Sequence, residues 1–92
     1  MVILPKNLKI KRRYILVKNI DFERLKKDYI EFFGSIDFYK SNIEMIKIND
    51  FYVISTNKRS INKVIFLLYL QKVRPINIFK TIKSLKQFLN IS

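Results

Sequence analysis

The stretch IEMIKINDFYVIS, residues 43–55, decides the predicted fold because it holds two strand patterns joined by a turn. Apolar side chains alternate from Ile43 to Ile48, and Phe51 to Ser55 is rich in aromatic and β-branched residues. Both patterns are typical of β-strands. Asn49-Asp50 between them is a two-residue turn signal, weaker than Asn-Gly. The stretch therefore predicts a β-hairpin in the middle of the chain.

Upstream of the hairpin, the pattern predicts a strand followed by a helix. Arg13 to Val17 is a nearly continuous run of β-prone residues, which suits a central strand. From Phe22 to Phe33, apolar residues recur at spacings of three and four, with Asp21 as the expected N-cap and Gly34 as the expected stop. Residues 36–41 match neither pattern clearly.

Downstream of the hairpin, a second helix is expected from an apolar stripe that runs from Ile61 to Tyr69. Asn57 or Ser60 is its expected cap. A short strand through residues 76–78 follows Pro75, and residues 82–89 predict a basic amphipathic helix.

The element order β-α-β-β-α-β predicts an α+β fold of the ferredoxin-like, RRM-like kind. We expect a four-stranded antiparallel sheet with helices on one face and an additional basic C-terminal helix. One such domain is expected over residues 13–92, after a basic N-terminal arm over residues 1–12.

Charge is distributed unevenly along the chain, which has 19 basic and seven acidic residues and a formal net charge of +12. All seven acidic residues lie within residues 21–50, and both flanks carry only cations. Such a field concentrates polyanions, of which nucleic acid is the commonest in a cell. The alternative partner is an anionic membrane surface.

Several kinds of chemistry are excluded by composition. The chain has no Cys and no His, so it lacks thiol chemistry, disulfides and the commonest general base. One Gly is too few for a phosphate-binding loop. Asp28 and Glu31 are spaced to share a helix face, but a solvated helix surface explains them better than a metal site. We therefore expect a protein that is not an enzyme by itself and holds no cofactor.

The longest apolar run, residues 64–70, is too short for a membrane span, which needs about 20 residues. No signal peptide is expected either, because residues 6–18 are charged. These patterns predict a cytoplasmic protein that does not insert into a membrane.

Aromatic residues offer two further interpretations. Tyr14 and Tyr52 are placed to stack bases if one sheet face is open, or to join the core if the terminal helix covers that face. The surplus of aromatic residues also predicts a protein interface. Its candidate residues are Tyr14, Phe38, Tyr39 and Phe51.

Three stretches resemble one known family, archaeal ribonuclease P protein component 2, which is homologous to the eukaryotic Pop-five and Rpp-fourteen subunits. They are Leu4-Pro5 to Tyr14-Ile15, Val53 to Lys58 with the apolar helix that follows, and Lys80 to Lys86. The chain departs from the family pattern by its shortness and at two dipeptides. Ser55-Thr56 stands where the family has Arg-Cys, and Phe79-Lys80 where it has Ser-Gly.

The resemblance implies a non-catalytic RNA-binding subunit. In that family the RNA subunit removes the 5′ leader of precursor tRNA by metal-assisted hydrolysis, so Mg²⁺ would be held by the RNA. The implied partners are ribonuclease P RNA, precursor tRNA, protein component 3 and a second copy of the chain, in a complex with two copies of each protein. The rival functions are a generic ferredoxin-like module for single-stranded nucleic acid and a basic membrane-surface protein.

The expected mechanism is electrostatic, because cations that neutralise crowded phosphates reduce the Mg²⁺ that a folded RNA needs. Solvated surface cations are the alternative for each candidate. The candidate RNA-contacting residues are Lys9, Lys11, Arg12 and Arg13 near the start, Lys58 and Arg59 at the turn into the second helix, and Lys80, Lys83 and Lys86 around the last helix.

Overall fold

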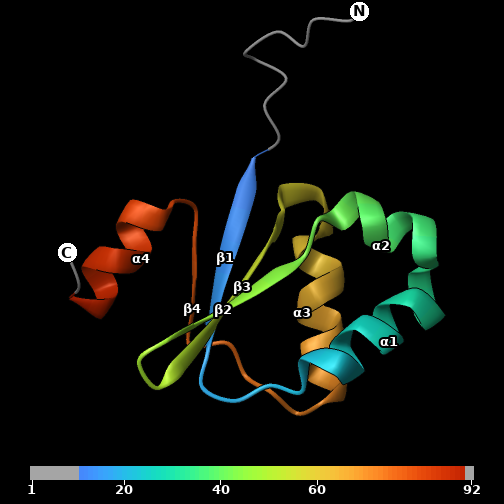
Figure 1. The fold of residues 1–92 in the computed structure, drawn as a ribbon, viewed down its shortest axis with the longest axis horizontal. Helices are drawn as coiled ribbons and strands as arrows, with labels where there is room; N and C mark the ends of the chain where they lie inside the picture. The colour runs from blue at the N-terminus through green and yellow to red at the C-terminus, as the bar shows by residue number, and fades with distance from the viewer. Residues whose placement is uncertain (1–10, 91–92) are drawn as a thin grey trace, which may run out of the picture.

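A computed structural model describes residues 11–90 of the chain (Figure 1). Its strands are β1 (Arg12–Val17), β2 (Glu44–Ile48), β3 (Phe51–Asn57) and β4 (Asn77–Phe79). Its helices are α1 (Phe22–Phe33), α2 (Ser35–Ser41), the short 3₁₀ helix η2 (Lys58–Ser60), α3 (Ile61–Leu70) and α4 (Ile82–Leu89). The predicted elements are all present, and residues 36–41, which matched no pattern, belong to α2.

The four strands form one antiparallel sheet in the order β2-β3-β1-β4. Each helical connection joins two parallel strands with a third strand between them: β3 separates β1 from β2, and β1 separates β3 from β4. This is the split β-α-β arrangement of ferredoxin-like α+β folds. The fold class predicted from the sequence is confirmed.

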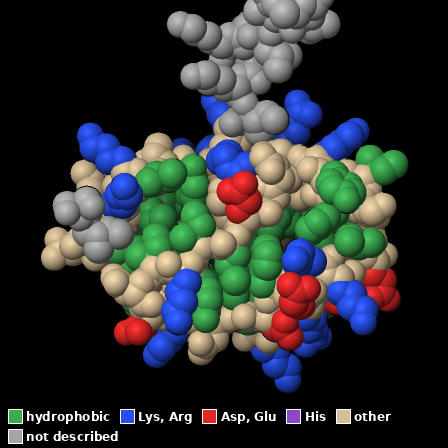
Figure 2. Space-filling view, in the orientation of Figure 1, with side chains coloured by type: hydrophobic (Ala, Val, Ile, Leu, Met, Phe, Trp, Pro, Cys, Tyr) green, Lys and Arg blue, Asp and Glu red, His purple; other side chains and the backbone are tan. Residues whose placement is uncertain are grey.

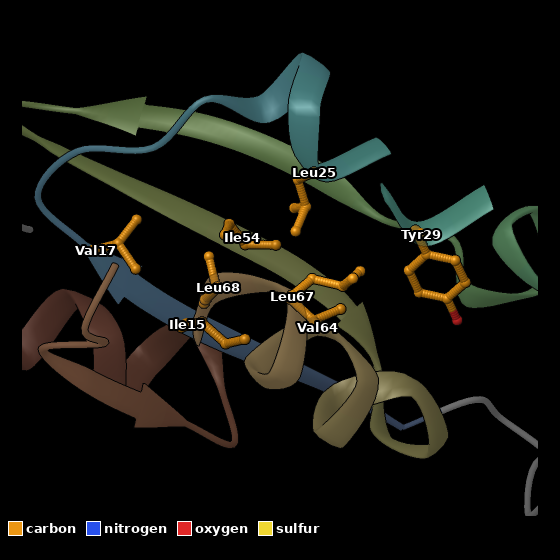
Figure 3. Packing of buried hydrophobic residues seen from close by; sticks show 8 residues of the cluster. All are labelled: Ile15, Val17, Leu25, Tyr29, Ile54, Val64, Leu67 and Leu68. Carbon is orange, nitrogen blue, oxygen red and sulfur yellow. The ribbon is translucent and has the colours of Figure 1, made fainter. Parts of the chain in front are cut away.

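One face of the sheet is covered by α1, α2 and α3, which lie together on one side in Figure 1. Figure 3 shows the core there. Its fully buried members are Ile15, Val17, Leu25, Tyr29, Ile54, Val64, Leu67 and Leu68. Because side chains alternate along a strand, Ile15 and Val17 face this core while Leu16 between them faces away.

The other face of the sheet is covered by α4 alone (Figure 1). Leu16, Val53, Phe79 and Leu85 form a second, smaller buried cluster. Tyr14, Ile48, Phe51 and Leu89 pack against it but are only partly buried.

Local sequence explains where the helices begin and end. The Asp21 side chain caps α1 by accepting a hydrogen bond from the Arg24 backbone N–H at 3.1 Å. Gly34 ends α1 with a φ of 93°, a conformation that side chains disfavour, and α2 starts directly after it. Thr81 caps α4 by accepting from the Ser84 N–H at 3.1 Å.

The second-helix cap was predicted wrongly. Neither Asn57 nor Ser60 makes a side-chain cap hydrogen bond at the start of η2 or α3. Instead, the Asn57 amide donates to the Lys40 carbonyl. A short 3₁₀ turn leads the chain into α3, so the polar side chain is free to join β3 to the end of α2.

Candidate nucleic-acid interface

The sheet topology brings three cationic segments to one end of the molecule. β1 begins where β3 and β4 end, because Arg12 pairs with Asn57 and Tyr14 pairs with Phe79 in antiparallel register. We call this the cationic end, made of Lys11, Arg12, Arg13, Lys58, Arg59 and Lys80. Figure 2 shows Lys and Arg side chains along the upper edge of the molecule, where β1 begins in Figure 1.

The turn after β3 is held against the start of β1. The Lys58 backbone N–H donates to the Lys11 carbonyl at 2.8 Å. Lys11, Lys58 and Arg59 are all exposed, and so is Lys80 after β4. Backbone bonding thus fixes the spacing of these cations while their charged groups remain in solvent.

Arg12 has a different role from the one predicted for it as an arm residue. β1 begins at Arg12, one residue earlier than expected, so Arg12 belongs to the sheet. Its guanidinium donates to Ser55 Oγ at 2.7 Å and to the Asn42 carbonyl at 2.8 Å. Two of its donors are therefore spent on joining β1 to β3 and to the loop before β2, which corrects its assignment as a free cation.

The two positions that depart from the family pattern in β3 are used inside the protein. Ser55 and Thr56 are buried. Ser55 accepts from Arg12, and Thr56 Oγ1 donates to the Ser41 carbonyl at 3.0 Å. Both hydroxyls thus hold β3 to its neighbours.

The remaining candidate cations lie on or near α4, except for one. Lys83 and Lys86 are exposed and three residues apart, so they lie next to each other on the helix surface. Lys80 precedes the helix and joins this pair to the cationic end. Lys9 lies outside the described residues.

Two charged residues at this end were missed by sequence analysis. The Lys40 carbonyl accepts from Asn57, which places the exposed Lys40 at the cationic end. Glu44 pairs in register with Ser55 and adds one exposed negative charge there. Neither position had a local signal, because both are brought there by the register of β2 against β3.

Lys63 carries the one resolved pKa shift in the described part of the chain. Its ammonium group forms an ion pair with Asp37 between α3 and α2. The hydrogen bond to Asp37 raises the pKa of Lys63 above its ordinary value, and the Asp37 charge adds to this while desolvation opposes it. This cation is compensated and is not part of the cationic end.

The aromatic candidates do not share one surface. Tyr14 packs against the α4 cluster, whereas Tyr52 packs against the core under α1 and α3, so the two cannot form one stacking platform. Among the interface candidates, Tyr14 and Phe51 lie on the α4 face. Phe38 packs on the opposite core and Tyr39 beside it is 82% exposed. Residues near both faces therefore remain separate candidates.

The apolar stripe of the second helix was also assigned one wrong residue. Tyr69 is 77% exposed, and Leu67 takes a place in the core beside Leu68. Tyr69 instead lines a hollow of about 280 Å³ at the end of α3, together with Lys72, Val73, Arg74 and Pro75.

No protein-family model matches the chain, and no curated protein matches it. Within residues 11–90, no three acidic side chains gather where they could hold a metal ion. The same residues contain no helix of sufficient length and apolar character to cross a membrane.

Proposed function

We propose that this chain is a non-catalytic RNA-binding subunit of ribonuclease P, which contacts the catalytic RNA through its cationic end. The observation that carries the proposal is the convergence of cations from β1, β3 and β4 at one end of the sheet. Cations held at fixed spacing suit a folded RNA, in which phosphates from different strands lie close together.

The resemblance to ribonuclease P protein component 2 supports the more specific part of the proposal. Its three stretches include the start of β1, the end of β3 and the segment from Lys80 into α4. These stretches are far apart in sequence and meet at the cationic end. Similar segments thus coincide with the candidate surface.

In the proposed mechanism, exposed cations such as Lys58, Arg59 and Lys80 replace condensed counterions at phosphates that the RNA fold brings together. The RNA then reaches its active geometry at a lower free Mg²⁺ concentration. Arg12 acts indirectly, because its hydrogen bonds to Ser55 and Asn42 hold the strands that carry these cations.

A membrane-surface role for α4 is less well supported. The helix uses Leu85, which is 3% exposed, to pack against the sheet, and Leu89 is partly buried there too. An interfacial helix needs a whole apolar face for the lipid.

The test is cleavage of precursor tRNA at limiting Mg²⁺ by cognate ribonuclease P RNA with protein component 3, with and without this chain. Rescue of cleavage by this chain is the expected result. No rescue, combined with equal binding to any RNA offered, would instead assign it to generic modules for single-stranded nucleic acid.

A double variant locates the RNA-binding surface. Lys58→Ala with Arg59→Ala should weaken RNA binding and lower the slope of log affinity against log salt by about 0.7–0.9 for each phosphate that is no longer neutralised. The matched control is Lys18→Ala with Lys27→Ala, two exposed cations away from the cationic end. Equal reductions in affinity for both double variants would show that net charge, rather than this surface, binds the RNA.

A further inference from the structure

The hollow at the C-terminal end of α3 is the second feature of the molecule that combines exposed cations with an aromatic side chain. Tyr69, Lys72 and Arg74 line it together with Val73 and Pro75. Tyr69 is 77% exposed, so the face of its ring is open to a ligand. The volume of about 280 Å³ is at the lower end for small-molecule sites, which suits one flat group and no more.

The backbone at Lys72 is unusual for a lysine. Lys72 has a φ of 60°, in the left-handed region. The other non-glycine residues with positive φ in the described part are all Asn: Asn42, Asn49 and Asn90. Asn tolerates this conformation better than most residues, and glycine is the usual choice after a helix. Local conformation therefore does not account for a lysine here, whereas a role for its charge does.

Hydrogen bonds hold this wall of the hollow in place. The Lys72 N–H donates to the Tyr69 carbonyl at 3.0 Å, and the Val73 N–H donates to the Leu68 carbonyl at 2.9 Å. Gln71 between them exchanges two hydrogen bonds with the Asp21 backbone, at 3.2 and 3.0 Å. The turn that carries Lys72 is thus fastened both to α3 and to the start of α1.

Within residues 11–90, neither Lys72 nor Arg74 forms an ion pair with a carboxylate. Asp21 is the acidic residue bonded to this turn, and its carboxylate is engaged in capping α1. The two positive charges therefore remain available to an anion beside the Tyr69 ring.

We propose that this hollow binds one nucleotide of a single-stranded RNA segment, with the base stacked on Tyr69 and the adjoining phosphates at Lys72 and Arg74. An exposed aromatic ring beside unpaired cations is the arrangement by which proteins hold single strands, since every base has a face to stack and every nucleotide a phosphate. The inference rests on the proposed function as an RNA-binding protein and adds a second contact to it.

The second contact lies away from the cationic end. α3 separates the two, with Lys58 and Arg59 before its first residue and the hollow after its last (Figure 1). Its ten residues span about 15 Å at 1.5 Å per residue. A folded RNA at the cationic end would thus need an unpaired extension to reach Tyr69.

The test measures binding of fluorescein-labelled pentauridylate by fluorescence anisotropy. Tyr69→Ala should weaken binding about 5- to 150-fold, the range expected for removing one base stack. Tyr69→Phe keeps the ring and should retain the affinity of the unmodified chain. Loss of affinity in both variants would contradict a stacking role.

Lys72→Asn separates ligand binding from folding. It should weaken pentauridylate binding and lower the salt slope by about 0.7, the value for one single-strand phosphate. Its melting temperature should not fall, since Asn suits the left-handed conformation. Lys27→Asn removes an equal charge from an exposed site on α1 and should leave affinity unchanged.

The outcomes distinguish this inference from the proposed function. If Tyr69→Ala and Lys72→Asn leave pentauridylate binding unchanged while Lys58→Ala with Arg59→Ala weakens binding of ribonuclease P RNA, the hollow is not a nucleotide site and the proposed function stands. The same holds if the unmodified chain binds ribonuclease P RNA but no pentauridylate. Binding of neither RNA would overturn both proposals.

Discussion

On the face covered by α1 and α3, eight residues are completely buried, whereas on the face covered by α4 four residues are buried and their neighbours are only partly covered. Ile46 on the edge strand β2 lies on the α4 side of the sheet and is 50% exposed, and Phe88 on α4 is 53% exposed. Both faces belong to the same four strands. The difference arises from how much helix is available to cover each.

This comparison teaches which part of the molecule holds the fold and which part is free for other work. Burial of apolar surface is the main stabilising contribution, at about 25 cal/mol per Å². The closed face therefore provides most of the stability. The α4 face and the cationic end beside it tolerate more change, which is where a binding protein needs variable surface.

The largest expected effect comes from opening the closed face. Leu68→Ala removes a fully buried side chain between α3 and the sheet and should reduce the free energy of unfolding by about 2–5 kcal/mol. Chemical denaturation followed by circular dichroism measures this reduction. Ile46→Ala on the other face is the control and should cost less than about 1 kcal/mol; equal reductions would contradict the comparison.

The corresponding change on the α4 face should cost less. Leu85→Ala should reduce the free energy of unfolding by about 2 kcal/mol, the lower end for buried leucines, because the partly exposed surroundings can close over the gap. Native-state hydrogen exchange should show faster exchange in α4 while α1 and α3 stay protected. Uniformly faster exchange in all helices would mean that α4 is integral to the core.

A third change tests the polar link at the end of the α4 face. Arg12→Ala leaves the Ser55 hydroxyl without its guanidinium partner and should cost about 1–2 kcal/mol. Arg13→Ala is the matched control, since the one side-chain hydrogen bond found for Arg13 goes to the neighbouring Arg12 carbonyl. A thermal melt of each variant distinguishes them. Similar melting temperatures would show that Arg12 acts only as a surface charge.

The smallest effect is expected on the outer side of the closed face, at the Lys63–Asp37 pair. Both side chains are about a third exposed, so Lys63→Gln should cost less than about 1 kcal/mol at neutral pH.

The pH dependence of this effect has a definite sign. The folded-state pKa of Lys63 is raised, so its contribution is complete below the unfolded-state pKa and is lost as pH rises through the folded-state value. The difference in stability between Lys63→Gln and the unmodified chain should therefore disappear only in strongly alkaline solution. A difference that vanished near neutral pH would rule out the ion pair as its source.

Most of the fold was predictable because the signals are local. Alternation in residues 43–48, the turn at Asn49-Asp50 and the cap at Asp21 each depend on neighbouring residues, and the structure confirms each of them. The residues 35–41 of α2 were missed, since seven residues are too few for a helical repeat to stand out.

The candidate site was predictable in composition but not in arrangement. Clusters of cations were visible in the chain, yet their meeting at one end depends on the pairing of Arg12 with Asn57 and of Tyr14 with Phe79. The internal use of the Arg12 guanidinium also depends on this register.

By itself, the sequence determined the strands, the long helices, the excess of positive charge and the confinement of acids to the central segment, because these follow from the order and periodicity of neighbouring residues. Only the tertiary structure decided which side chains share a surface. Tyr14 and Tyr52 lie on opposite faces since the register pairs Tyr52 with Val17, three residues from Tyr14, and side chains alternate along a strand. Tyr69 is exposed because α3 ends beside a turn that leaves the sheet, a fact about packing between distant segments.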